Sequence, residues 1–260
     1  MIEALHEDGV FDWRSGFRWV RSEGMKWIAH RGASATAPEN TLVAFRRAWE
    51  AGADGIECDV RVSSDGVPVV VHDRTLRRVA GLTEAVGSVP WSMLRGVDVG
   101  AWKGKEWHGE TIPSLEQVLE TLPEGRVMCL EIKAGMRTLD ALARWVETER
   151  ITGENCRWLT FSRRVARGLR ARWPKIPVWM NLEPRWWTTM GWQMAWTVKE
   201  GLAGVSVKDG RWLTPRKLAE LKDAGLEVAV WTVNDPERAR ELEGWGVDAV
   251  MTDRIEAMKA

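Results

Sequence analysis

The sequence has no tyrosine, few cysteines, no excess of charge of either sign and no long apolar run. Its 37 basic and 37 acidic side chains cancel, which excludes a uniformly basic surface for nucleic acid or anionic lipid. Any anion that the protein binds must therefore be held by a local cluster. No apolar stretch approaches the roughly 18 residues that span a bilayer, so we expect no transmembrane segment. The absence of a Gly-rich nucleotide loop and of GKS or GKT argues against a nucleotide-binding protein.

Cysteine usage and the N-terminal segment indicate the compartment. Cys58, Cys129 and Cys156 are odd in number and lie in separate apolar runs, which predicts buried thiols in a reducing environment. The N-terminus begins with acidic and aromatic residues and does not resemble a secretory signal, so we expect a cytoplasmic protein. Residues 1–24 have no clear hydrophobic period and are predicted to form an arm outside the folded domain of residues 25–260.

From Lys26 onward, short β-rich runs alternate with helical patterns, which is typical of βα units and a parallel sheet. A chain of 260 residues is long enough for one (β/α)8 barrel. The strand candidates are WIAHR, DGIECDVRV, VPVVVHD, RVMCLEIK, RWLTF, PVWMNL, GVSVK, EVAVWTV and DAVMTD. These candidates exceed by one the eight strands that such a barrel uses.

The surplus strand is identified by a short connection. Only residues 63–66 separate the second and third candidates, whereas a parallel crossover takes a dozen or more residues. We therefore expect an antiparallel hairpin that turns back above the rim and brings His72 roughly opposite Glu57 or Asp59. The residues around 75–112, rich in Gly, Trp and charge, are predicted to form a small inserted subdomain after this hairpin. The expected fold is an α/β TIM barrel with that insertion.

Capping residues predict where several helices begin. Asn40 precedes TLVAFRRAWEAG, Ser114 precedes LEQVLETL, and Asp235 is followed by Pro236 at the first helical position. Glu39, in PENT, is interpreted as part of the first turn and cap rather than of a site, although it lies within reach of one.

In such barrels the active site lies at the C-terminal ends of the strands. The polar and aromatic residues predicted at these ends are His30, Arg31, Glu57, Asp59, His72, Glu131, Lys133 and Trp231. Because Glu57 and Asp59 are two apart on a strand, both point the same way while the residue between them faces the helices. With Glu131 they form three carboxylates that suit a hard divalent cation, Mg²⁺ or Ca²⁺. Zinc is disfavoured because we expect the cysteines to lie off this face.

Simpler alternatives exist for these residues. The carboxylates can be ion-paired to Lys133 or Arg31 in the barrel core, although cores rarely bury so many charges without a task. His30 alone can be a hydrogen-bonded core histidine, but His30 and His72 together provide two proton-transfer groups. An arginine, a lysine and a divalent cation around one point form a phosphate receptor. Trp231 is either core or a flat wall for a small ligand.

The sequence also resembles a known family, the glycerophosphodiester phosphodiesterases. The segments that carry the resemblance are AHRGASATAPENTLVAF, GIECDVRVSSDGVPVVVHD, DVGAWKGKEWHGETIPSLEQVL, LEIK, VWTVND and GVDAVMTD. They occur in order, with family-like spacing, from Lys26 to Arg254.

The resemblance implies a TIM barrel that hydrolyses small-molecule glycerophosphodiesters to sn-glycerol 3-phosphate and an alcohol with one bound divalent cation. The positions that match the family's functional residues are Glu57, Asp59 and Glu131 for the metal, His30 and His72 for the acid/base pair, Arg31 and Lys133 for the phosphate, and Trp231 near the glycerol. Trp231 stands where tyrosine is also familiar in the family, so a hydroxyl is missing there.

Two other functions stay open. The first is a phosphodiesterase or cyclising lyase that acts on phospholipid or lysophospholipid head groups, for which Trp91, Trp102 and Trp107 of the insertion would form an apolar rim. The second is a non-catalytic barrel that binds a phosphorylated metabolite, which would have no need of two proton-transfer groups. If the protein hydrolyses glycerophosphodiesters, the attacking group can be water or a glycerol hydroxyl, which would give a cyclic phosphate. The sequence is compatible with both.

Overall fold

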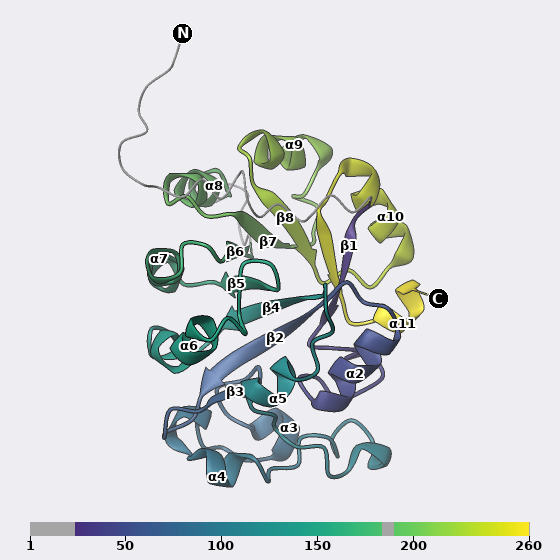
Figure 1. Cartoon of the computed structure of the whole chain (residues 1–260). Helices are drawn as coiled ribbons and strands as arrows, with labels where there is room; N and C mark the ends of the chain where they lie inside the picture. Colours follow the sequence, from purple (N-terminus) through teal and green to yellow (C-terminus); the bar gives the residue numbers. More distant parts are fainter. Residues whose placement is uncertain (1–23, 184–189, 260) are drawn as a thin grey trace.

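The computed structural model describes residues 24–183 and 190–259, in which the strands form one sheet in the order β1-β9-β8-β7-β6-β5-β4-β2-β3. Because β1 also pairs with β2 in parallel, eight strands close into a barrel and β3 remains outside it (Figure 1). The expected TIM barrel is thus confirmed. The strands are β1 (Lys26–His30), β2 (Gly55–Val62), β3 (Pro68–Val70), β4 (Val127–Ile132), β5 (Cys156–Thr160), β6 (Val178–Leu182), β7 (Gly204–Lys208), β8 (Glu227–Trp231) and β9 (Ala249–Thr252).

Helices surround the barrel (Figure 1). They are α2 (Leu42–Glu50), α5 (Leu115–Leu119), α6 (Arg137–Glu147), α7 (Arg163–Arg172), α8 (Met190–Lys199), α9 (Pro215–Asp223), α10 (Pro236–Trp245) and α11 (Ile255–Lys259). In the described parts of the chain, no helix is both long and apolar enough to cross a bilayer. The proposed arm, apart from Gly24, lies outside the described residues, as does Ala260 at the end of the predicted domain.

The third strand pairs antiparallel with β2, with Val60 opposite Val70, as the short connection predicts. It is shorter than expected, because it ends at Val70 and His72 lies in the following loop. The loop is fixed by two contacts: Val71 N donates to Asp59 O at 2.9 Å, and the Arg61 guanidinium donates twice to the His72 carbonyl, at 2.7 and 3.0 Å. His72 is therefore placed beside the end of β2.

The predicted insertion contains α3 (Arg77–Ala80), η1 (Val86–Ser88), α4 (Trp91–Leu94) and η2 (Lys105–Trp107). In Figure 1, α3 and α4 lie beside β3, away from the ring of barrel helices. The insertion has its own apolar cluster, which includes Val69 and Val71 from the hairpin and Leu76, Val86, Leu94 and Ile112. A second small core thus packs against the returning strand.

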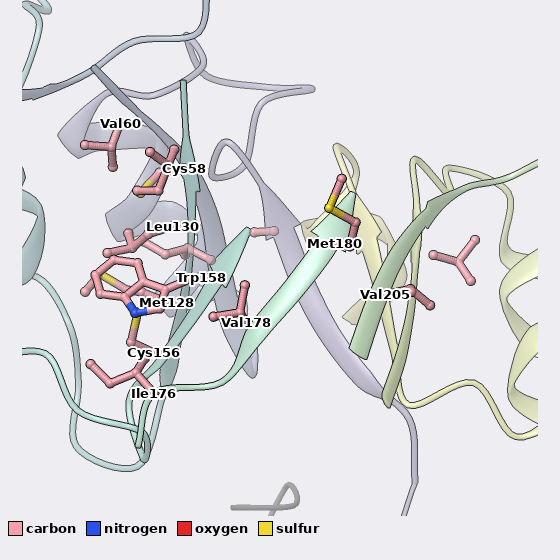
Figure 2. Close-up of a cluster of buried hydrophobic side chains, with 14 of the residues drawn as sticks. Cys58, Val60, Met128, Leu130, Cys156, Trp158, Ile176, Val178, Met180 and Val205 are labelled. Carbon is pink, nitrogen blue, oxygen red and sulfur yellow. The ribbon is translucent and has the colours of Figure 1, made fainter. Parts of the chain in front are cut away.

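Alternate residues along the strands face two different cores. One set packs between sheet and helices, and Figure 2 shows part of it, with Cys58, Leu130 and Trp158 from neighbouring strands. The other set fills the barrel interior below the rim, with Ile28, Leu159 and Trp179 among its members. Layers of apolar side chains inside the barrel are what close its lower half.

The cysteines are buried and free, as predicted. Cys58 and Cys156 face the helices, but Cys129 belongs to the interior cluster, on the same face of β4 as Glu131. The expectation that all three lie off the site face is therefore wrong for Cys129. The thiol nevertheless lies one layer below the rim among apolar side chains, and burial raises its pKa.

Two of the three predicted helix starts are correct. Ser114 and Gln117 form a capping box at α5, and Asp235 caps α10 with Pro236 at its first position. At α2 the cap is Thr41, not Asn40, because the Thr41 hydroxyl accepts from Ala44 N. The Asn40 side chain is instead directed across the barrel rim to Asp59.

Candidate active site

A cavity of about 240 Å³ opens at the C-terminal ends of the parallel strands. The residues predicted from the sequence that line it are His30, Arg31, Glu57, His72, Glu131, Lys133 and Trp231. Asp59 lies next to these residues and is almost completely buried. The rest of the wall comes from residues that the sequence analysis did not select, namely Leu159, Phe161, Asn181, Glu183, Ser206 and Met251.

The loop after β1 holds Arg31 in an unusual backbone conformation. Its φ is +59°, in the left-handed region that non-glycine residues adopt at a cost, and its N–H donates to Glu57 O at 2.9 Å. Gly32 follows with φ +82°, and a Cβ there would lie 2.7 Å from the backbone of Ala44. The close packing of this loop on α2 therefore requires glycine and fixes where the Arg31 side chain begins.

Glu57, Asp59 and Glu131 form a compact acidic group in the described residues. One carboxylate oxygen from each lies within 4.8 Å of the others, and all three side chains are buried. Burial raises the pKa of Glu57 well above its usual range, and the charges of Asp59 and Glu131 raise it further. Burial and Asp59 also raise the pKa of Glu131, to about 7, against the opposing effect of Lys133.

Two cations compensate this acidic group only in part. Lys133 Nζ lies 2.6 Å from Glu131 Oε1 and 3.2 Å from Asp59 Oδ1, and Arg31 Nε lies 3.3 Å from Asp59 Oδ2. Although burial alone would raise the pKa of Asp59, Lys133 and Arg31 lower it to about 2. The simpler alternative of core ion pairs is thus partly correct. Glu57 and Glu131 still keep raised pKa values, because burial and the neighbouring carboxylates outweigh the effect of the two cations.

The donor set fits a hard divalent cation. Three carboxylates converge on one point, and the buried Asp59 Oδ1 has the Lys133 ammonium at 3.2 Å but no hydrogen bond of good geometry from the described residues. A divalent cation would bind this oxygen together with Glu57 and Glu131. The acidic group can therefore hold a divalent metal ion.

His30 is tied to a residue that the sequence analysis missed. Its Nδ1 lies 2.7 Å from Asp253 Oδ1, just after β9. Burial would raise the pKa of Asp253, but the contact with His30 lowers it to about 2, so this carboxylate is an acceptor at neutral pH. The proton between the two atoms must then sit on Nδ1, which leaves Nε2 as the proton-transfer atom. Nε2 lies 3.9 Å from Glu57 Oε2, at the acidic group.

His72 is more exposed than His30 and has a comparable partner. Its Nδ1 lies 2.9 Å from Asp73 Oδ1, and the Asp73 carboxylate also accepts from Arg78 Nε at 2.7 Å. Burial lowers the pKa of His72, and the positive charges of Arg31 and Lys133 lower it further, against the opposing charge of Asp59. Both histidines thus line the cavity, and Nδ1 of each contacts a carboxylate.

Two polar residues before α2 also support the site. Glu39 Oε1 accepts from Arg31 Nη1 at 3.0 Å, and both carboxylate oxygens of Glu39 accept from Arg78. Its interpretation as a turn residue alone is therefore incomplete. Asn40 Nδ2 donates to Asp59 Oδ2 at 2.8 Å, and Asn40 Oδ1 accepts from Asp59 N at 3.2 Å. These contacts fix the orientation of Arg31 and Asp59.

Aromatic side chains form one side of the cavity. Trp231 lines the cavity and meets Phe161 edge to face, with ring centroids 6.0 Å apart. Asn181 and Ser206 add polar groups to the same cavity. The period of two along the strands is the signal that could have found these residues, because Phe161 and Asn181 each lie two positions after the inward-facing Leu159 and Trp179.

Comparison with known proteins decides the family. The glycerophosphoryl diester phosphodiesterase family model matches residues 30–257. The chain belongs to this family. The match includes both histidines, the three acidic residues and the two cations of the cavity, and the expected enzyme class is confirmed at the level of the family.

Individual members of the family resemble the chain along most of its length. It is 32% identical to a Mycobacterium tuberculosis (strain ATCC 25618 / H37Rv) protein named probable glycerophosphodiester phosphodiesterase 2, covering 93% of this chain and 92% of that protein. It is 28% identical to a glycerophosphodiester phosphodiesterase of Caldanaerobacter subterraneus subsp. tengcongensis, over 89% and 95% of the two chains. A solved Oleispira antarctica phosphodiesterase in complex with the product sn-glycerol-3-phosphate superposes with a TM-score of 0.81 at 29% identity, over 91% of this chain and 96% of that one.

Proposed function

We propose that the protein hydrolyses glycerophosphodiesters to sn-glycerol 3-phosphate and an alcohol, with a divalent cation and two histidines. The observation that carries the proposal is the meeting of two imidazoles, two fixed cations and three buried carboxylates in and directly beside one cavity. The Oleispira antarctica relative, whose complex contains sn-glycerol-3-phosphate, supports this substrate class.

The residues divide the chemistry between binding and proton transfer. Arg31 and Lys133 neutralise the phosphate and stabilise the charge that grows on its oxygens in the transition state. One histidine removes the proton from the attacking oxygen, a new P–O bond forms, and the P–O bond to the alcohol breaks while the other histidine protonates the departing oxygen. The attacking oxygen belongs either to water or to a glycerol hydroxyl, in which case water opens the cyclic phosphate in a second step.

Glu57, Asp59 and Glu131 are the residues that would hold Mg²⁺ or Ca²⁺. When bound, such an ion would withdraw electron density from phosphorus and compensate negative charge in the transition state. The glycerol arm is assigned to the aromatic side of the cavity, where the flat faces of Trp231 and Phe161 cover carbon and Asn181 offers hydrogen bonds to hydroxyl groups.

The test is a turnover panel for glycerophosphocholine, glycerophosphoethanolamine and glycerophosphoglycerol, with sn-glycerol 3-phosphate as the measured product. We expect turnover with Mg²⁺ or Ca²⁺, its loss in excess EDTA and its return when the ion is restored. Glu131→Gln should bind the ion less tightly, while Glu154→Gln, an identical change at an exposed position, serves as the control. Full activity in EDTA with no metal in the protein would contradict the metal assignment. Calorimetric binding of sn-glycerol 3-phosphate without turnover of any diester would favour the non-catalytic alternative.

The phospholipid alternative gains no further support from the insertion. The Trp102 ring lies near Arg78 and Lys103, at 5.6 and 5.7 Å, and the Trp107 ring lies 5.7 Å from Arg47. Trp91 packs against the apolar cluster of the insertion. These rings therefore do not form a continuous apolar rim, and an assay of lysophospholipid against glycerophosphocholine separates the two substrate classes.

A further inference from the structure

A second cavity, of about 420 Å³, adjoins the first and shares His30 and Arg31 with it. Its other walls come from the loop after β1, the end of β9 and the inserted subdomain, and the charged or aromatic residues among them are Glu39, Trp102, Lys103, Asp253 and Arg254. The cavity therefore contains side chains of both charges, and their partners decide which ligand it favours.

Both carboxylates of this second cavity are already engaged. Glu39 accepts hydrogen bonds from Arg31 and from both terminal nitrogens of Arg78. Asp253 contacts His30 Nδ1 through one oxygen and accepts from Asn234 Nδ2 at 2.9 Å through the other. A cationic ligand would have to displace these internal partners, which costs the charge-assisted hydrogen bonds they make.

Arg31 is paired with Glu39, but the other two cations of the cavity wall, Lys103 and Arg254, have no such partners in the described residues. Lys103 Nζ donates to the Ser34 carbonyl at 2.7 Å, and within the described residues neither Lys103 nor Arg254 has a carboxylate within 4.0 Å. The Trp102 ring, 42% exposed, already has Arg78 and Lys103 near it, so it is not a free cage for a quaternary ammonium group. The uncompensated charge is positive, and it favours an anionic group on the ligand.

The two cavities meet where the phosphorus atom would lie, if the proposed function is correct. With its phosphate held by Arg31 and its glycerol arm against Trp231, a diester would have to direct its other arm away from the first cavity. The second cavity shares His30 and Arg31 with the first, and its wall includes neither Trp231 nor Phe161.

We infer that the second cavity receives the alcohol part of the diester, and that the enzyme prefers diesters whose alcohol carries an anionic group over those that carry choline. Lys103 and Arg254 are then specificity residues that act on the leaving group. This inference rests on the proposed function and adds the chemical class of the preferred head group.

The test compares three diesters by kcat/KM at low ionic strength: glycerophosphoinositol, glycerophosphoinositol with one phosphate on the inositol ring, and glycerophosphocholine. We expect the ring-phosphorylated diester to exceed glycerophosphoinositol by about tenfold, as one good charge-assisted contact supplies, with glycerophosphocholine last. The advantage should shrink as salt is added, because the cations are near the surface. The double variant Lys103→Gln and Arg254→Gln should bring the kcat/KM ratio of the ring-phosphorylated diester to glycerophosphoinositol close to unity. Lys175→Gln, which makes the same lysine change before β6 at the other end of the barrel, should keep the ratio of the natural sequence.

Two results would overturn the inference but not the proposed function. The first is turnover of all three diesters without the expected order of kcat/KM, and the second is an order of kcat/KM that persists in the double variant. If no diester is turned over under any metal condition, the proposed function itself fails and the inference falls with it. Glycerophosphoinositol lacks the phosphate on the inositol ring, so its turnover in each variant also reports whether the protein has folded.

Discussion

The two histidines of the active site are held by different parts of the molecule. His30 ends a barrel strand, and its partner Asp253 follows β9, which pairs directly with β1. His72 lies in the loop after the hairpin, and its partner Asp73 is fixed by Arg78 from the inserted subdomain. The side chain of His30 is 15% exposed and that of His72 is 30% exposed. The barrel therefore determines the orientation of one imidazole, while the insertion influences the other.

The two aspartates that contact these histidines are also held differently. Asp253 is held by Asn234 Nδ2 at 2.9 Å and Ser34 Oγ at 3.1 Å, so His30 belongs to a network that follows from strand register. Asp73 is held by Arg78, on a short helix, and its side chain is about as exposed as that of Asp253. Because several hydrogen bonds hold a carboxylate more firmly than one pair with a half-exposed arginine, the His30 side should tolerate less change in its supporting residues.

The largest effects are expected when either imidazole is removed. His30→Ala and His72→Ala should each reduce kcat by about 10²- to 10⁴-fold, the usual contribution of a general acid or base. His108→Ala, in the insertion and 80% exposed, is the matched control and should retain activity. Steady-state kinetics with far-UV circular dichroism checks both activity and folding. Near-normal turnover in either site variant would show that its histidine transfers no proton in the reaction.

A smaller and unequal effect is expected for the two carboxylate partners. Asp253→Asn should lower kcat by about 10- to 100-fold, because the amide no longer fixes the proton on His30 Nδ1. Asp73→Asn should lower it less, because His72 is more exposed and its partner is less firmly held. KM should change little in Asp73→Asn, since Asp73 lines neither cavity. Asp253 lines the second cavity, so the two variants are compared by kcat. Equal losses in kcat would mean that the insertion holds its histidine as firmly as the barrel does.

Much of the site could be predicted because it follows the geometry of parallel strands. A polar residue at the C-terminal end of a barrel strand lies at the rim, and this rule alone gathers His30, Glu57 and Glu131 in one place. The short hairpin connection similarly identified the strand outside the barrel and delivered His72 to the rim. These predictions needed only strand order and a period of two.

The errors come from features that such rules do not contain. Asp253 is 223 residues from His30 in the sequence, and nothing in the segment of residues 251–253 indicates which side chain Asp253 will contact. Asn40 stands where caps commonly occur, but its φ of +59° turns the side chain toward Asp59. The error for Cys129 is of another kind, because the period of two itself places this residue, two positions before Glu131, on the inward face of β4.

The smallest effect is expected at Arg78, which joins the insertion to both the His72 and the Arg31 sides of the site through Asp73 and Glu39. Arg78→Gln removes two ion pairs, with Glu39 and with Asp73, and the arginine side chain is 43% exposed. An exposed pair contributes at most about 1 kcal/mol and only the pair with Asp73 supports His72, so kcat should fall by about fivefold or less. The matched control is Arg77→Gln, an exposed neighbour on the same short helix.

Combining Arg78→Gln with Asp73→Asn should add little to the loss of kcat in Asp73→Asn alone, because both changes act through His72. Combining Arg78→Gln with Asp253→Asn should instead multiply the two losses of kcat. If Arg78→Gln instead equals Asp253→Asn in kcat, the insertion controls Arg31 as well as His72, and the division between a barrel-held and an insertion-held half of the site is wrong.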